Sequence, residues 1–269
     1  MAQVRIGAHP WVYAATQPEY DIYPIVDQIF EDMAYAGMDG IELMHTALRH
    51  DGVVERLTEL SKKHSLPVIG TSFGGNMLDA AQAPEAVQDA ELIVPRLAAL
   101  GGTNLGTSVG RAPEPKTPEQ FDVQAETLRK IMAVCKDNGV VLNLHNHTYE
   151  VENGEHDLNG TLERIPDVKL GPDLGWVTRA RIDPVDFIRR HADRLVFLHL
   201  RDETDAHTWP EAMGEGDMDY GAIGKALQEA GFSGDAAVEL AHERDLELTR
   251  PLKDSLKMSR EYVRQTLGH

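Results

Sequence analysis

Short apolar runs rich in β-branched residues recur along the chain, and each is followed by a longer segment with the apolar spacing of an amphipathic helix. This alternation is typical of parallel strands joined by crossover helices. The runs start roughly 25 to 40 residues apart, which leaves enough chain for one crossover each. We therefore predict eight strands, at residues 4–7, 40–44, 66–71, 103–107, 140–145, 169–172, 195–200 and 236–240.

The segments between these strands carry helix signals at their ends. Residues 19–36 place apolar side chains on one face and stop at Gly37, a residue type that often ends a helix in the left-handed conformation. Residues 118–138 show the same spacing and are followed by Gly139. A further helix at residues 184–190 has Asp183 at its cap and proline at its first position.

Eight strand–helix units without a break in composition predict closure into a (β/α)8 TIM barrel, an α/β fold that forms a single domain over residues 1–269. The competing open, doubly wound sheet usually carries a G-x-G-x-x-G turn after its first strand, and this sequence has none there. Gly214 and Gly216 lie in a long loop with no P-loop lysine after them. A dinucleotide or nucleoside triphosphate site is therefore unsupported.

Charge and cysteine content limit the kinds of partner and cofactor that the protein can have. The 44 acidic residues exceed the 26 basic ones by 18, and a field of that sign repels phosphate backbones and anionic lipid headgroups. We expect no nucleic-acid and no membrane partner. The single cysteine, Cys135, excludes a disulfide framework and a thiolate metal cluster. Without an apolar stretch of signal-peptide or membrane-spanning length, we expect a cytoplasmic protein, with a homodimer as the default assembly.

The active site of such a barrel is built from the C-terminal ends of its strands and the loops that follow. In this sequence those positions hold an unusual density of metal-type ligands. Residues two apart on a strand project to the same side, so His145 and His147 are expected to face one centre. The candidates at the strand ends are His9, Trp11, Glu42, His45, His145, Asn146, His147, Glu150, Asp173, His199, Arg201, Asp202, Glu239 and His242. This pattern predicts a divalent metal site.

Four segments also carry a resemblance to a known family. They read LHNHTYEVE at 144–152, LGPDLGWVTRARIDP at 170–184, FLHLRDE at 197–203 and AAVELAHE at 236–243. Together they resemble the xylose-isomerase-like TIM barrels, which comprise sugar phosphate isomerases and epimerases, tagatose epimerases, inosose dehydratases and the endonuclease IV branch. The likeness is closest to the branch whose fifth strand reads His-Asn-His.

The resemblance implies one divalent ion held by Asp173, His199, Glu239 and one residue supplied by the fifth strand. Many relatives have Glu at the position of His145, so this ligand is left open between His145 and Glu150, with His147 as a third choice. Mixed carboxylate and imidazole ligation suits Mn, Mg, Co or Zn. In a further departure, Trp176 stands where several relatives have a histidine.

The resemblance also implies the chemistry. A divalent ion chelates two neighbouring oxygens of a polyhydroxy carbonyl compound, acidifies the C–H between them and stabilises the resulting enediolate. Glu239 would move the proton, with Glu150 or His147 as the second acid or base on the opposite face. The expected activity is therefore a metal-dependent sugar isomerase or epimerase that acts on a small sugar or polyol.

Four side chains are candidates for substrate contacts. Glu42 and His9 at the rim of the first two strands would bind sugar hydroxyls, although a structural hydrogen bond accounts equally well for each. Trp176 would either stack on a sugar ring or pack in the core, and Arg201 would hold a carboxylate or phosphate unless an ion pair occupies it. The long loop 203–219, which contains Trp209, is either a lid over the site or plain surface.

Three other functions remain. A lyase of the inosose dehydratase or keto-glycoside type would use the same proton abstraction followed by departure of a leaving group. An endonuclease IV-like enzyme would need three zinc ions and a basic groove, which the excess of 18 negative charges disfavours. A non-catalytic sugar-binding barrel is disfavoured by the presence of Asp173, His199 and Glu239 in ligand positions.

Overall fold

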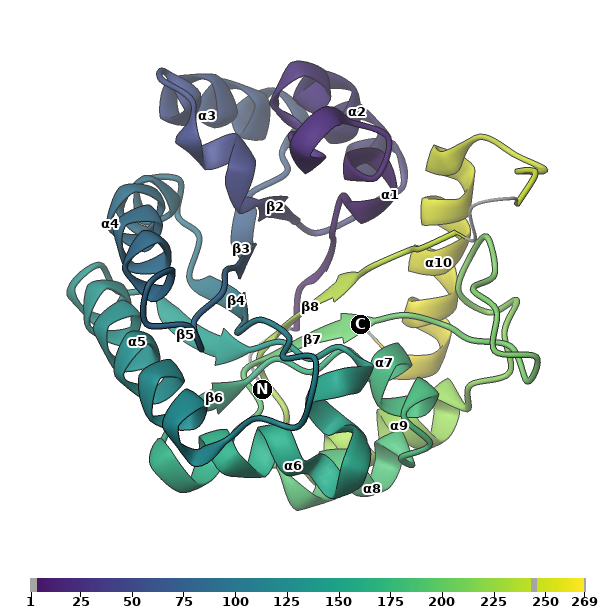
Figure 1. Ribbon diagram of the computed structural model, residues 1–269. Helices are drawn as coiled ribbons and strands as arrows, with labels where there is room; N and C mark the ends of the chain where they lie inside the picture. The colour runs from purple at the N-terminus through teal and green to yellow at the C-terminus, as the bar shows by residue number, and fades with distance from the viewer. Residues whose placement is uncertain (1–3, 243–245, 269) are drawn as a thin grey trace.

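A computed structural model describes residues 4–242 and 246–268, so Glu243, the last residue of the fourth motif, lies outside the described residues. All eight predicted strands form, and they pair in parallel in the order β6-β5-β4-β3-β2-β1-β8-β7. Figure 1 shows these strands surrounded by the helices. The strands are β1 Ile6–Ala8, β2 Ile41–Met44, β3 Val68–Gly74, β4 Asn104–Ser108, β5 Val141–Leu144, β6 Lys169–Leu170, β7 Phe197–Leu200 and β8 Asp235–Val238.

The barrel closes between β6 and β7, the two ends of that order. β6 is only two residues long, and single bridges outside the named strands join Leu170 to Leu195 and Asp173 to His199. The backbone N–H of Val196 donates to Leu170 O at 3.0 Å, and that of His199 donates to Pro172 O at 2.9 Å. The predicted single-domain (β/α)8 TIM barrel is confirmed.

The helices between the strands largely follow the predicted positions. The capping box of Thr117 and Gln120 opens α5, and Asp183 caps α8 by accepting from Val185 N at 2.8 Å. The longer helices are α2 Val26–Tyr35, α3 Val53–His64, α4 Ala83–Ala99, α5 Pro118–Asp137, α6 Thr148–Arg164, α9 Tyr220–Glu229 and α10 Leu252–Leu267. The shorter ones are α1 Trp11–Ala14, α7 Leu174–Arg179 and α8 Pro184–Arg190, with 3-10 turns η1 Pro18–Tyr20, η2 Tyr23–Ile25 and η3 His45–Arg49.

The predicted helix at 19–36 is wrong at its start. Only α2 is a regular helix there, and it is preceded by the turns η1 and η2. Pro18 and Pro24 lack the backbone N–H that a continuous helix would use, and Glu19 and Tyr20 have left-handed φ values of 53° and 56°. The predicted end is correct, because Gly37 follows with φ 75°.

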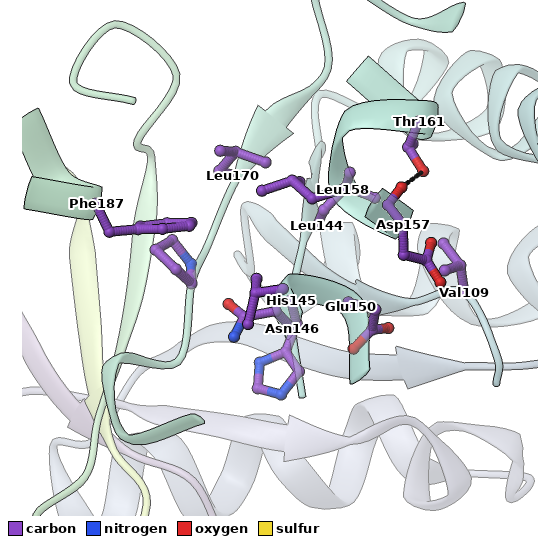
Figure 2. A pocket seen from close by; sticks show the side chains of 12 residues that line it. Val109, Leu144, His145, Asn146, Glu150, Asp157, Leu158, Thr161, Leu170 and Phe187 are labelled. Atoms are coloured by element: carbon purple, nitrogen blue, oxygen red, sulfur yellow. Dashed lines mark hydrogen bonds between the residues drawn. The ribbon is translucent and has the colours of Figure 1, made fainter. Parts of the chain in front are cut away.

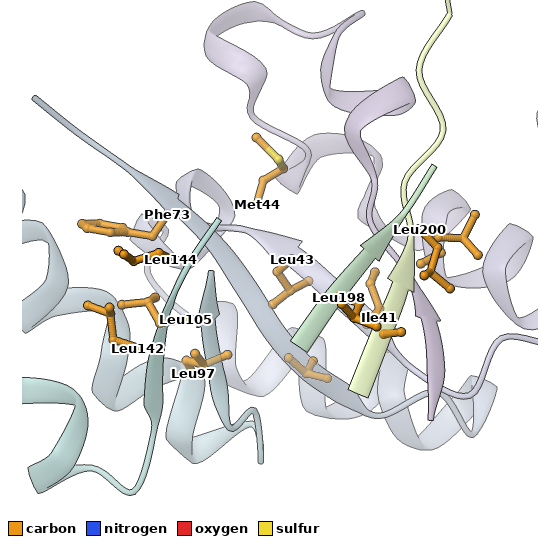
Figure 3. Packing of buried hydrophobic residues seen from close by; sticks show 14 of the residues in the cluster. Ile41, Leu43, Met44, Phe73, Leu97, Leu105, Leu142, Leu144, Leu198 and Leu200 are labelled. Atoms are coloured by element: carbon orange, nitrogen blue, oxygen red, sulfur yellow. The ribbon is translucent and has the colours of Figure 1, made fainter. Parts of the chain in front are cut away.

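Strand alternation sorts the side chains of the barrel wall. In β7, Leu198 and Leu200 pack outward in the large hydrophobic core between sheet and helices, part of which Figure 3 shows. Phe197 belongs to a separate small cluster with Ile69 and Ala237, which fills the barrel interior. His199, two residues after Phe197, therefore projects inward as well. The sequence pattern of β7 thus places an imidazole inside the barrel.

Glycines make the barrel interior wide enough for this inner cluster. A Cβ at Gly40 would lie 2.5 Å from Ile69 Cγ2, and a Cβ at Gly7 would lie 2.6 Å from Ile69 Cδ1. Any larger residue at these positions would displace Ile69. Among the described residues, no helix is both long and apolar enough to span a bilayer.

Candidate metal centre and barrel mouth

Four donor side chains converge at the C-terminal ends of neighbouring strands. One ligand atom from each of the four lies within 4.8 Å of the other three, and all four side chains are buried. They are His145 after β5, Asp173 after β6, His199 in β7 and Glu239 after β8. Three of them are the residues that the sequence placed in ligand positions, and His145 is the fourth.

Local structure fixes the two carboxylates. Asp173 caps α7, because its Oδ1 accepts from Gly175 N at 2.9 Å and Trp176 N at 3.1 Å. Its own N–H donates to Asn146 Oδ1 at 3.1 Å, which ties the end of β6 to that of β5. Glu239 follows β8 directly, and its N–H donates to Leu200 O at 3.0 Å. Each carboxylate is therefore held by backbone geometry.

His199 lies at the centre of the cluster. Its Nδ1 is 2.7 Å from His145 Nδ1 and 3.1 Å from Glu239 Oε2, and its Nε2 is 2.5 Å from Glu42 Oε2. Burial works to lower the pKa of His199, but the carboxylates of Glu42 and Glu239 outweigh it and raise the pKa to about 9. Burial and the neighbouring His199 lower the pKa of His145 well below its ordinary value, so its ring is neutral.

Arg201 bridges the two carboxylates of the cluster. Its Nη2 is 3.0 Å from Asp173 Oδ2 and 2.7 Å from Glu239 Oε1. Burial raises the pKa of Asp173. Burial also acts to raise the pKa of Glu239, but the nearby Arg201, His9 and His199 together hold that pKa below its ordinary value. Glu239 is therefore ionised.

The residues present fit a divalent ion. Three buried carboxylates, Glu42, Asp173 and Glu239, face the buried guanidinium of Arg201 and the ring of His199, so acidic groups outnumber basic ones in the cluster. Glu239 Oε2 has no hydrogen-bond donor among the described residues, although it is buried. An unsatisfied buried carboxylate oxygen beside two imidazoles is what a cation of mixed N and O preference would bind.

The three candidates for the fifth-strand ligand have different surroundings. His145 belongs to the four-donor set, whereas Glu150 and His147 do not. Glu150 Oε2 instead accepts from His147 N at 2.5 Å and lies 3.3 Å from His147 Nδ1, which forms the capping box of α6. Burial acts to lower the pKa of His147, but the neighbouring Glu150 raises that pKa above its ordinary value. The two residues form an acid–base pair beside the cluster.

His9 and Glu42 lie deeper than a rim position. Both are buried, and His9 Nδ1 is 3.7 Å from Glu239 Oε1. Neither ring nitrogen of His9 has a hydrogen-bond partner within residues 4–242 and 246–268. Glu42 contacts His199, so the structural hydrogen bond that the sequence left as an alternative is present for Glu42.

Aromatic side chains form a wall above the cluster. The rings of Trp176 and Trp209 meet edge to face at 5.0 Å, and the Arg201 guanidinium lies 5.2 Å from the Trp176 ring. On the other side, His147 lies 5.8 Å from Trp176 and stacks on Tyr149 at 5.3 Å. Sequence reasoning missed Tyr149, whose only signal was its place in the motif LHNHTYEVE.

The loop 203–219 brings Trp209 to this wall. Arg179 of α7 holds the loop by donating to Glu203 Oε1 at 2.7 Å and to His207 O at 2.8 Å, and it stacks on Trp209 at 3.5 Å. The carboxylate of Asp202 gathers the loop backbone by accepting the N–H groups of Glu203, Gly214, Gly216 and Met218. The loop is therefore held in place beside the aromatic wall.

Two predicted residues lie away from the cluster. His45 begins η3, 3.8 Å from Asp89 of α4 and edge-on to Phe73. His242 lies 3.5 Å from Glu211 O. Figure 2 shows a mainly apolar cavity behind the site, with His145, Asn146 and Glu150 in its lining and with Leu158, Leu170 and Phe187 among its apolar walls.

Comparison with known proteins places these residues in a family context. A family model described as "Xylose isomerase-like TIM barrel" matches residues 30–262. An inosose dehydratase from Geobacillus kaustophilus is 26% identical over 183 residues, which cover 59% of this chain and 58% of that protein. The chain thus spans little more than half the length of the curated relatives that it matches.

Solved structures share the whole fold at low sequence identity. D-allulose 3-epimerase from Methylomonas sp. has a TM-score of 0.79 and 18% identity, and the match covers 99% of this chain and 100% of that chain. 3-Keto-D-glucoside 4-epimerase from E. coli has a TM-score of 0.76 and 19% identity, with 96% and 100% covered. These likenesses concern the fold.

Proposed function

Because the chain belongs to the xylose isomerase-like TIM barrel family, we propose that it is a divalent-metal-dependent isomerase or epimerase of a small sugar or polyol. The observation that carries this proposal is the convergence of His145, Asp173, His199 and Glu239 within 4.8 Å. The names of the similar solved structures, which are sugar epimerases, support the substrate class.

The metal would be held by His145, Asp173, His199 and Glu239. When bound, a divalent ion supplies Lewis-acid polarisation of neighbouring substrate oxygens, which makes the adjacent C–H more acidic. Mn, Mg, Co and Zn all accept such a mixed donor set. The excess of acidic groups in the cluster favours any of them.

The chain's own side chains supply the proton transfers. Glu239 is ionised, with Oε1 on Arg201, and its Oε2 lies 3.1 Å from His199 Nδ1 but makes no hydrogen bond within the described residues, so Glu239 accepts the proton from the carbon beside the carbonyl. The pair of His147 and Glu150 would return a proton to the opposite face of the reacting carbon. The raised pKa of His147 keeps a proton on that ring. Two groups on two faces give epimerisation, whereas one group gives isomerisation.

The barrel mouth provides the substrate contacts. Trp176 offers an apolar surface to a sugar ring, and Trp209 and Tyr149 extend that wall on either side. Arg201 and His9 are the polar groups beside it, although Arg201 already pairs with both cluster carboxylates. We expect them to bind oxygens close to the reacting carbon.

A second candidate is a lyase of the dehydratase type. It is favoured by the inosose dehydratase relatives, which match 55 to 59% of this chain. The same proton removal by Glu239 would then be followed by loss of the β-hydroxyl, with His147 donating a proton to the departing oxygen. The site needs no further residue for this outcome.

The test is metal-dependent hydrogen exchange with solvent. The protein is stripped with a chelator, reloaded with Mn²⁺, Co²⁺, Zn²⁺ or Mg²⁺, and incubated in D₂O with ketohexoses, ketopentoses, 3-keto-glucosides and inososes. NMR should show deuterium at an epimerised carbon for an epimerase, or a product without one hydroxyl for a lyase. Asp173→Asn, which removes a ligand charge, should lose both bound metal and exchange. Exchange by metal-free protein, or stoichiometric metal with none of these sugars altered, would contradict the proposal.

A further inference from the structure

Glu42 is a buried carboxylate that has no role in the proton transfers proposed above. It lies in β2, where Ile41 and Leu43 pack outward in the hydrophobic core, so the alternation of the strand turns Glu42 into the barrel interior. Glu42 Oε2 is 2.5 Å from His199 Nε2, and both side chains are almost fully shielded from solvent. Burying a carboxylate is costly unless a partner compensates it, and His199 is that partner.

The two nitrogens of the His199 ring face different partners. Nε2 faces Glu42, whereas Nδ1 lies 3.1 Å from Glu239 Oε2 and 2.7 Å from His145 Nδ1. A carboxylate at Nε2 holds a proton on that nitrogen, so Nδ1 is the nitrogen left to bind a cation, which takes the place of the Nδ1 proton. The ring then directs Nδ1 at the other three donors.

The neighbouring strand leaves room for Glu42. A Cβ at Gly106 of β4 would lie 3.3 Å from Glu42 Oε1, which is tighter than ordinary contact. The same Cβ at Gly106 would lie 3.8 Å from Asn143 Oδ1. Glu42 Oε1 itself has no hydrogen-bond partner within the described part of the chain. Among the described residues, His199 is thus the hydrogen-bond partner of the Glu42 carboxylate.

We propose that Glu42 is a positioning residue that holds the proton on His199 Nε2 and so presents Nδ1 to the metal. This inference rests on the proposed metal site. It gives Glu42 a role different from the contact with sugar hydroxyls that the sequence predicted. Metal-ligating histidines generally donate their other N–H to a carboxylate or carbonyl, and loss of that partner typically weakens metal binding about 10- to 100-fold.

Calorimetric titration of Mn²⁺ into chelator-stripped protein tests the affinity. Glu42→Gln removes the charge at nearly constant volume, and we expect binding about 10- to 100-fold weaker than wild type. Asp32→Asn is the matched control, because Asp32 is also buried and hydrogen-bonded, to Tyr13 Oη at 2.9 Å, but contacts none of the four donors. It should bind Mn²⁺ like wild type. Should Glu42→Gln fail to fold, Glu42→Asp keeps the charge and should bind with intermediate affinity.

A spectroscopic readout separates positioning from simple stability. In Zn²⁺-loaded protein labelled with ¹⁵N-histidine, the His199 signals, assigned by their loss in His199→Gln, should show a protonated Nε2 and a metal-bound Nδ1. Glu42→Gln should shift the Nε2 proton and speed its exchange with solvent. If wild type binds no Mn²⁺, the proposed function fails. If wild type binds and Glu42→Gln matches it in affinity and spectrum, the positioning role is wrong.

Discussion

At the scale of single residues, Asn146 joins the ends of β5 and β6. Its Oδ1 accepts from Asp173 N at 3.1 Å and its Nδ2 donates to Asp173 O at 3.4 Å, both in a buried setting. Asn146→Ala leaves the backbone N–H of Asp173 without its acceptor, whereas Asp173 O keeps the hydrogen bond from Val177 N at 3.1 Å. We expect a loss of about 1–3 kcal/mol in the free energy of unfolding, measured in urea, together with weaker metal binding.

A second asparagine serves as the control for this change. Asn159 is exposed and donates one hydrogen bond, to Gly154 O at 3.2 Å. Asn159→Ala should alter the free energy of unfolding by less than about 0.5 kcal/mol. Equal effects of the two substitutions would mean that the Asn146 bridge contributes nothing specific.

The buried ring of His45 should make the free energy of unfolding depend on pH. Burial, assisted by Arg49, lowers the pKa of His45 to about 4 against the opposing effect of Asp89. Because the folded pKa is below the unfolded value of about 6.5, the unfolded chain binds the proton first as pH falls. The stability from neutral His45 is therefore complete above about pH 6.5 and is lost progressively towards pH 4.

The variant His45→Gln isolates this contribution. Between about pH 7 and pH 4.5, wild type should lose about 2–3 kcal/mol of unfolding free energy more than the variant does, because carboxylate protonation is common to both proteins. Urea unfolding at a series of pH values measures the difference. Parallel pH curves for the two proteins would show that His45 is not the titrating group.

At the scale of elements, the loop 203–219 depends on one carboxylate. Asp202 accepts from Gly214 N at 2.8 Å and from Gly216 N at 3.1 Å, and a Cβ at Gly216 would lie 2.3 Å from Asp202 Oδ1. Asp202→Asn replaces one acceptor oxygen by a donor and removes the charge. We expect faster amide hydrogen exchange over the loop and a stability loss of about 1–3 kcal/mol.

The capping residue of α8 gives the matched control for the loop. Asp183 accepts from Val185 N at 2.8 Å, and asparagine caps helices about as well as aspartate does. Asp183→Asn should therefore leave hydrogen exchange over residues 203–219 unchanged. If Asp202→Asn also leaves it unchanged, the four backbone contacts do not hold the loop.

The elements also show how far the sequence pattern reaches. The recurring apolar runs located the eight strands, and glycine, proline and cap signals located the ends of α5 and α8. The start of α2 was wrong because local periodicity does not register the backbone demands of Pro18 and Pro24. The short helix α7, which Asp173 caps, was not predicted either.

The site shows a second limit of sequence reasoning. Motifs placed Asp173, His199 and Glu239 at strand ends, but the choice between His145 and Glu150 depends on how the chain turns after β5. That turn engages Glu150 in the capping box of α6, and so only His145 joins the donor set. The pairing of Arg201 with Asp173 and Glu239 likewise depends on how neighbouring strands meet in the barrel. The local sequence around Arg201 does not show this arrangement.

At the scale of the whole molecule, the closure of the barrel is linked to the metal centre. β6 and β7 meet through single bridges, whereas β3 and β4 pair over five consecutive residues. The same seam carries two of the four donors, because the Asp173–His199 bridge joins β6 to β7. A cation held by both side chains would therefore cross-link a junction of the barrel that is otherwise held by single bridges.

Hydrogen exchange with and without Mn²⁺ tests this link. At a metal concentration about 100 times Kd, binding to the native state alone stabilises it by about 2.7 kcal/mol. Because opening of the seam separates two ligands, the amides of Val196 and His199 should gain more protection than those of β3 and β4. Asp173→Asn should abolish this gain while leaving the exchange pattern of β3 and β4 as it is. Uniform protection across all strands would show instead that the metal stabilises the fold only globally, with the seam no weaker than the rest.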